Sequence, residues 1–176
     1  MEFSIQPNLK NEKATLIPLE EDDFEVLYHA ASDPLIWAQH PNKTRYQKEV
    51  FKNYFKGAIE SGGAFLIKDT ATGAIAGSTR FYDYDHSQNL ILIGYTFYAR
   101  EYWGTGMNAE VKKTMLNYIF QYVDHVLFHI GAGNVRSQMA ITRLGAKKID
   151  EINVAYYGEP PAINFVYQIS KINWSV

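Results

Sequence analysis

Hydrophobic and polar positions follow two kinds of pattern along this chain. Apolar residues that recur every three or four positions predict amphipathic helices over residues 24–31, 47–59, 107–123 and 134–144. β-Branched and aromatic runs predict strands over residues 14–18, 64–68, 74–82, 90–98, 125–130, 147–157 and 162–172. Hairpin-linked strands in the middle and a β–α–β crossover near the end predict an α/β (α+β) fold, with a mixed sheet and helices on both faces.

Several details of these elements can be predicted from the same pattern. In the helix over 107–123, Glu110, Lys112, Lys113 and Asn117 are expected on the solvent side. In the helix over 134–144, the residues expected to face inward are Val135, Met139, Ala140 and Leu144. Asp33-Pro34 is expected to end the first helix. Residues 35–45 are predicted as a loop or short turn, and residues 83–89 as a polar loop.

Composition narrows the class of protein. The 176 residues suffice for a single domain over 1–176 with a full core. A net charge of −2 gives no basic field for nucleic acid, and the absence of cysteine excludes disulfides, zinc–thiolate sites and a cysteine nucleophile. No apolar run reaches membrane-spanning length, and the polar residues 1–13 lack the apolar core of a signal peptide. We therefore expect a cytoplasmic protein with no nucleic-acid partner, no membrane partner and no metal.

A glycine turn joins the strand over 90–98 to the helix that follows it. Gly104 and Gly106 stand directly before the helix, where N–H groups without intrahelical acceptors and the helix dipole favour an anion. Phosphate is the anion usually found at such a site. The turn is not a P-loop, because no Gly-Lys-Ser/Thr follows, and it lacks the third glycine of a dinucleotide fingerprint. A purely structural tight turn is the alternative.

At this point the residues carry a family resemblance. Trp103-Gly-Thr-Gly-Met-Asn108 resembles the acetyl-CoA pyrophosphate loop of the GNAT (GCN5-related N-acetyltransferase) superfamily. The wider string from Tyr102, together with Asn134-Val-Arg-Ser137 and Leu144-Gly145-Ala146, is similar to the RimJ/RimL-like branch. The likeness covers roughly residues 14–172. It implies a mostly antiparallel central sheet of about six to seven strands, flanked by helices on both faces.

The resemblance also implies a reaction and a donor site. The reaction is transfer of acetyl from acetyl-CoA directly to a primary amine, without a covalent intermediate, on a protein N-terminus or a small molecule. Asn134 would bond the pantetheine arm or cap its helix, and Ser137 would protonate the departing thiolate. The other residues that the resemblance places against acetyl-CoA, through backbone groups or as parts of the loop, are Phe97, Tyr98, Trp103, Gly104, Thr105, Gly106, Met107, Asn108 and Ala109.

Two departures from the family pattern concern the chemistry. Asn108 stands where glycine or alanine is expected, and the strand over 90–98 carries no glutamate to act as a base. Candidate catalytic residues besides Ser137 are Tyr95 and His86, and the acidic candidates for a base are Asp83, Asp85 and Glu101. The predicted acceptor cleft is lined by Trp37, His40, Arg80 and Tyr82. Core packing is the alternative for Trp37.

Two other classes of function remain open at this stage. The chain would be a non-catalytic acyl-CoA-binding module if Asn108 and the missing glutamate mark lost chemistry. It would be a protein-interaction module if the glycine turn is structural. The sequence does not identify the acceptor amine, and it leaves a homodimer open.

Overall fold

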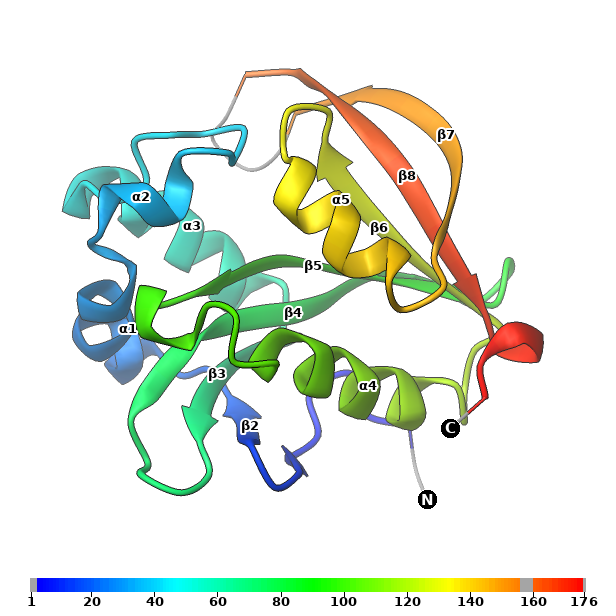
Figure 1. Cartoon of the computed structure of the whole chain (residues 1–176), viewed down its shortest axis with the longest axis horizontal. Coiled ribbons are helices and arrows are strands. Elements are labelled where there is room, and N and C mark those ends of the chain that lie inside the picture. Colours follow the sequence, from blue (N-terminus) through cyan, green and yellow to red (C-terminus); the bar gives the residue numbers. More distant parts are fainter. Residues whose placement is uncertain (1–2, 156–159, 176) are drawn as a thin grey trace.

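One twisted sheet forms the centre of the protein (Figure 1). The computed structural model describes residues 3–155 and 160–175. In that part of the chain the sheet has eight strands in the order β1-β2-β3-β4-β5-β6-β8-β7. The strands are β1 (Leu9–Lys10), β2 (Ala14–Pro18), β3 (Ala64–Asp69), β4 (Ile75–Asp85), β5 (Leu90–Tyr98), β6 (His125–Gly131), β7 (Lys147–Val154) and β8 (Ala162–Ser170). All the neighbouring pairs are antiparallel except β5 with β6.

Helices cover both faces of this sheet, as the sequence pattern predicts. They are α1 (Phe24–Ala31), α2 (Pro34–Trp37), α3 (Lys48–Glu60), α4 (Met107–Ile119) and α5 (Val135–Thr142). Residues 35–45, predicted as a loop or short turn, thus begin within α2. Asp33 follows the end of α1. It is also the N-cap of α2, because its carboxylate accepts the Leu35 N–H at 2.9 Å.

The alternation of side chains along the strands divides the core in two. On one side of the sheet, Phe65 and Ile67 of β3 pack with the apolar face of α4 and with Ile141 of α5. On the other side, Ala64 and Leu66 pack with α1, α2 and α3. Figure 1 shows α4 and α5 over one face and α3 behind the other. Helices therefore close both faces of the central strands, whereas the edge strand β7 stays largely exposed.

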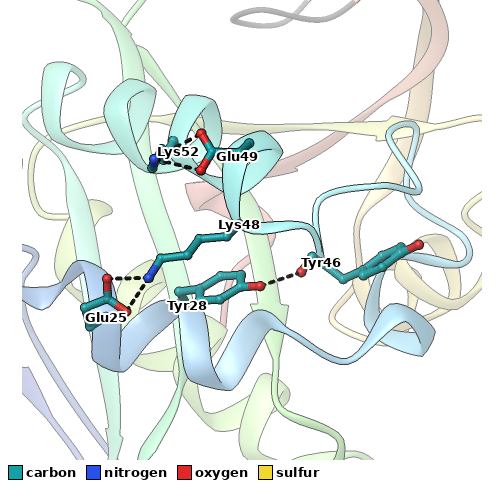
Figure 2. A network of polar contacts seen from close by, with 6 residues as sticks. All are labelled: Glu25, Tyr28, Tyr46, Lys48, Glu49 and Lys52. Atoms are coloured by element: carbon teal, nitrogen blue, oxygen red, sulfur yellow. Dashed lines mark hydrogen bonds and ion pairs between the residues drawn. The ribbon is translucent and has the colours of Figure 1, made fainter.

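Polar contacts tie α1 to the start of α3 on the surface (Figure 2). Lys48 Nζ lies 2.6 Å from Glu25 Oε1, and the Tyr28 hydroxyl donates to the Tyr46 carbonyl at 3.1 Å. Lys52 pairs with Glu49 one turn along the same helix. Pairs this exposed contribute at most about 1 kcal/mol each. They fix how the helices meet, while the aromatic cluster beneath them supplies the stability.

Several element boundaries differ from the sequence-based predictions. β1 was not predicted, because two residues are too few for a pattern to register. β4 runs on to Asp85, so the predicted polar loop over 83–89 shrinks to the turn after it. The helix predicted over 107–123 ends at Ile119, and Phe120 to Tyr122 form a turn. Residues 157 and 158, at the predicted junction of the last two strands, lie outside the described residues.

Two predictions of side-chain direction were also wrong. Val135 and Met139 of α5 are about half exposed, and the side chain that this helix buries fully is Ile141. Lys112 of α4, expected in solvent, is only 3% exposed. Its helical row leads to Leu116, four residues on, which is also buried. The buried face of α4 is therefore wider than the main apolar stripe of Met107, Val111 and Met115.

Candidate active site

The two central strands separate and open a cleft between them. β5 and β6 pair only from Leu90 with His125 to Leu92 with Leu127. Beyond these residues β5 continues to pair with β4, and β6 with β8, but not with each other. The facing edges therefore present backbone N–H and C=O groups that a ligand can bind. A cleft of about 630 Å³ follows this opening.

The glycine turn closes one end of the cleft at the start of α4. Gly104 and Gly106 both adopt left-handed backbone conformations, with φ of 72° and 84°. A Cβ on Gly106 would lie 3.1 Å from Lys13 Nζ, which donates to the Thr105 carbonyl at 2.7 Å. This ammonium adds positive charge to the positive end of the helix dipole. The sequence pattern did not identify Lys13, because it comes from a distant part of the chain.

The turn is held in place by hydrogen bonds of its own. Trp103 Nε1 donates to the Tyr98 carbonyl at 3.0 Å, which joins the turn to the end of β5. The Met107 N–H lies 3.3 Å from the Thr105 hydroxyl. The first bond within the helix runs from Glu110 N to Gly106 O at 3.1 Å, so Asn108 and Ala109 present N–H groups that have no intrahelical acceptor. Those two amides are therefore free to donate hydrogen bonds to an anion at this turn.

The start of α5 forms one side wall. Asn134 is 4% exposed, and its Oδ1 accepts the Ser137 N–H at 3.2 Å, so it caps this helix. The cap leaves the amide Nδ2 of Asn134 available to the cleft that the residue lines. Arg136 stacks over the Trp103 ring at 4.0 Å and donates to the Ile36 carbonyl at 3.2 Å. It therefore links α5 to α2 and to the glycine turn.

A β-bulge shapes the middle of the cleft. The register of β4 with β5 shifts between Ser78 and Arg80, so Tyr95 and Thr96 both oppose Thr79. Tyr95 has a φ of 52°, and the Tyr54 hydroxyl donates to its carbonyl oxygen. The Arg80 guanidinium lies 3.8 Å from the centre of the Tyr95 ring. These contacts fix the strained residue at the point where β5 leaves β6.

Two histidines line the cleft in environments that keep them neutral. Burial, followed by repulsion from Arg45 and Arg136, lowers the pKa of His40 to about 3. Burial also lowers the pKa of His129, against an opposing contribution from Asp83. His129 lies on β6 in the diverging segment, on the side opposite the buried Phe128. A neutral imidazole here can accept a proton at physiological pH.

Two buried polar groups lie in the same wall. The Tyr98 hydroxyl has no hydrogen-bond partner within the described part of the chain, and burial raises its pKa above the ordinary value. Orphaned buried hydroxyls are rare in folded proteins, and one in a cleft wall suits a ligand contact. Lys112 also lines the cleft, and burial lowers the pKa of its amine to about 7. The glycine turn, the diverging strands and these donors together fit a long anionic thioester.

Comparison with known proteins decides the family. The acetyltransferase (GNAT) domain matches residues 13–147, which include the glycine turn, the diverging strands and α5. The chain belongs to this GNAT acetyltransferase family. Members of the family use acyl-CoA as donor.

Solved structures agree on the fold of this acetyltransferase. A GCN5-related N-acetyltransferase from Brucella melitensis has a TM-score of 0.83 at 16% identity, over 96% of this chain and 80% of that one. A GNAT-family acetyltransferase from Bacillus anthracis has a TM-score of 0.76 at 16% identity, over 94% and 99% of the two chains. Spermidine N-acetyltransferase from Vibrio cholerae, in complex with CoA and spermine, has a TM-score of 0.69 at 14% identity, over 93% and 98%.

The structure brings most of the residues singled out from the sequence into one cleft. Those that line it are His40, Tyr82, Tyr95, Phe97, Tyr98, Trp103, Gly104, Gly106, Asn108, Ala109, Asn134 and Ser137. Thr105 and Met107 adjoin it without lining it: Thr105 supports the turn, and the Met107 side chain is buried in the core. Among residues 3–155 and 160–175, no acidic side chain lines the cleft.

Three candidates lie elsewhere. Trp37 is fully buried in the aromatic cluster, where its Nε1 donates to the Ala31 carbonyl, so it packs the core. Arg80 lies beneath the bulge and donates to the Gly57 carbonyl at 2.9 Å. His86 is exposed in the turn after β4 and lies 3.2 Å from the Tyr84 hydroxyl, because the extension of β4 carries it away from the cleft. The histidines that line the cleft are His40 and His129.

The described residues offer no grouping of three or more potential metal ligands. Within the same ranges, no helix is long and apolar enough to cross a membrane.

Proposed function

We propose that this GNAT protein, acting as one domain over residues 1–176, transfers acetyl from acetyl-CoA directly to a primary amine. The observation that carries the proposal is the divergence of β5 from β6, with the glycine turn at one end of the opening and α5 beside it. Bound acetyl-CoA supplies an acetyl group activated as a thioester. The chain's own residues bind this donor, orient it and handle the protons of the reaction.

Binding of the donor is assigned to the three walls of the cleft. The amides of Asn108 and Ala109, with the Lys13 ammonium, hold the pyrophosphate. The free edge of β5 at Phe97 and Tyr98 hydrogen-bonds the pantetheine arm, as does the Asn134 amide. Because these groups are held in place before the donor arrives, the protein loses little conformational entropy on binding. Orientation of the two reactants then provides most of the rate, on the order of 7–11 kcal/mol of the barrier.

Proton handling is assigned to His129 and Ser137. The attacking amine forms its bond to the acetyl carbon as the carbon–sulfur bond breaks, and it releases one proton overall. His129 takes this proton, directly or through water, because its lowered pKa keeps the imidazole neutral. The Ser137 hydroxyl, at the cleft side of α5, gives a proton to the departing thiolate and recovers one from solvent.

The charge of the cleft bears on the acceptor. Within the part of the chain that the structure describes, its charged lining is cationic, at Arg45, Lys112, Lys113, Arg136 and Arg143. A cationic cleft suits the phosphates of the donor and repels an acceptor with several ammonium groups. This favours a peptide N-terminus or a small amine over a polyamine such as the spermine bound by the Vibrio cholerae relative. The motifs of the glycine turn and of α5 support assignment to the RimJ/RimL-like branch.

The test is an acetyl-transfer assay that follows CoA thiol release and confirms the acetylated product by mass spectrometry. Peptides with different N-termini, simple primary amines and spermine serve as acceptors. We expect turnover with peptides or simple amines and little with spermine. The His129→Gln variant is expected to lose about 10²–10⁴-fold in rate and the acidic limb of the pH–rate profile. Tight acetyl-CoA binding without turnover on any amine would instead indicate a non-catalytic acyl-CoA-binding module.

A further inference from the structure

Lys112 is a buried amine with an unusual set of partners. It is 3% exposed, and its Nζ donates to the Thr96 hydroxyl at 2.8 Å and lies 3.2 Å from the Thr79 hydroxyl. The two threonine hydroxyls lie 2.7 Å apart and also bond each other. No ion pair with Lys112 occurs within the part of the chain that the structure describes. The amine therefore has neutral hydroxyls as partners and no counter-charge.

This arrangement is costly for the fold. Burial disfavours the charged form, and it is the one cause that lowers the pKa of Lys112 to about 7. An unbranched apolar side chain would continue the buried helical row toward Leu116 and would leave the threonine pair satisfied by its own hydrogen bond. A buried ionisable group that the fold does not need is a candidate for function when it lies in a cleft. Lys112 lines this one.

The location of the amine points to the reacting end of the donor. α4 begins at the phosphate-binding turn, and Lys112 lies one and a half turns farther along the helix. Its partner Thr96 is part of the bulge, four residues past the last pair that β5 forms with β6, where the two strands have separated. A protonated lysine has three hydrogens, and the two threonines take two of them. One hydrogen remains for the cleft.

We propose that Lys112 belongs to the acyl-donor site, where its amine provides a positive charge and a hydrogen bond beside the thioester end of bound acyl-CoA. The inference rests on the proposed function. Phosphate groups and the sulfur that gains negative charge as the carbon–sulfur bond breaks both favour the ammonium form. Lys112 is partly neutral in the free protein and takes up a proton when the donor binds.

The charged groups around Lys112 do not account for its lowered pKa. On its own helix, Lys113 and Glu110 pair with each other at 3.0 Å. From β4 and β5 it meets the two threonines, which do not titrate in this range. The other titratable or charged side chains around the cleft are His40, Arg45, Tyr82, Tyr95, Tyr98, Tyr102, His129, Arg136 and Arg143. None of them is a source of the lowered pKa of Lys112, since burial alone accounts for it.

Calorimetric titration with acetyl-CoA at about pH 8, in buffers with different ionisation enthalpies, tests the inference. We expect the wild-type protein to take up about half a proton or more on binding. Lys112→Met should take up none and bind acetyl-CoA about tenfold more weakly. Lys112→Arg, whose side chain cannot lose its proton, should also show no uptake. Lys52→Met, which removes an exposed lysine of α3, is the control and should behave as wild type.

Thermal unfolding separates this role from a structural one. We expect Lys112→Met to melt at a higher temperature than wild type, because the buried amine is removed. A melting temperature of Lys112→Met below that of wild type, or a proton uptake by Lys112→Met equal to that of wild type, would overturn the inference. Neither result would bear on the proposed function, provided that wild-type protein binds acetyl-CoA. Absence of acetyl-CoA binding in folded wild-type protein would instead refute the proposed function, and this inference with it.

Discussion

Asn134 performs two tasks that point substitutions can separate. Its Oδ1 accepts the Ser137 N–H and caps α5, while its Nδ2 is left for the cleft. Asn134→Ser keeps a capping oxygen and removes the amide donor. Asn134→Ala removes both. The pair of variants therefore measures the cap and the donor contact independently.

The expected magnitudes follow from the structure. Loss of an N-cap costs about 1 kcal/mol, so Asn134→Ala should lower the melting temperature by about 2–4 °C. Asn134→Ser should stay within a few tenths of a kcal/mol of wild type, since serine caps as well as asparagine. One lost neutral hydrogen bond is worth about 0.5–1.5 kcal/mol, so both variants should bind acetyl-CoA roughly 2- to 12-fold more weakly.

The assays are thermal unfolding and calorimetric titration with acetyl-CoA on the same preparations. Wild-type affinity in Asn134→Ser would remove the Asn134 amide from the donor site. A wild-type melting temperature in Asn134→Ala would show that the cap contributes nothing measurable to α5. If both variants lose stability equally, the reasoning that separates the oxygen from the amide is wrong.

Three further predictions concern the turn, the acid and the stability of the fold. Gly106→Val should abolish acetyl-CoA binding in a folded protein, because a β-branched residue is strained at a φ of 84° and its Cβ would press on Lys13; unchanged affinity by calorimetry would remove the turn from the site. Ser137→Ala should lower kcat with little change in acetyl-CoA affinity, and an equal loss of both in steady-state kinetics would count against an acid role. His40 should destabilise the protein as pH falls below about 6.5, because its imidazole takes up a proton in the unfolded chain but stays neutral in the folded one. The expected loss in the free energy of unfolding is about 2 kcal/mol at pH 5. Denaturant unfolding of His40→Gln should therefore show a shallower pH dependence than wild type.

The parts of the fold that local pattern determines could be predicted from sequence. Short stretches of consecutive residues determine the apolar face of α4, the strand composition of β5 and the glycine turn between them. The capping oxygen of Asn134 follows from its position before α5 in the same way. The residues proposed for the donor site could be singled out from the sequence, because the glycine turn and the start of α5 are contiguous stretches.

The residues that were missed depend on contacts between distant parts of the chain. In the sequence, His129 cannot be told apart from an ordinary strand residue. Its place in the cleft depends on the separation of β6 from β5, and strand pairing cannot be predicted from neighbouring residues alone. Lys13 reaches the glycine turn only because the chain entering β2 passes beside it. The sequence did contain an indication that Lys112 is buried, since it shares a helical row with the apolar Leu116. It was nevertheless predicted to face solvent because lysine is charged. Acceptor-side residues remain the hardest to infer for this reason.

The measurement that tests the central claim most directly is calorimetric titration of the wild-type protein with acetyl-CoA, with ATP as a control for non-specific phosphate binding. We predict saturable binding that is selective for acetyl-CoA, because the cleft joins the glycine turn, which we propose binds the pyrophosphate, to free strand edges that suit a pantetheine arm. A folded sample that binds acetyl-CoA no better than ATP would contradict it.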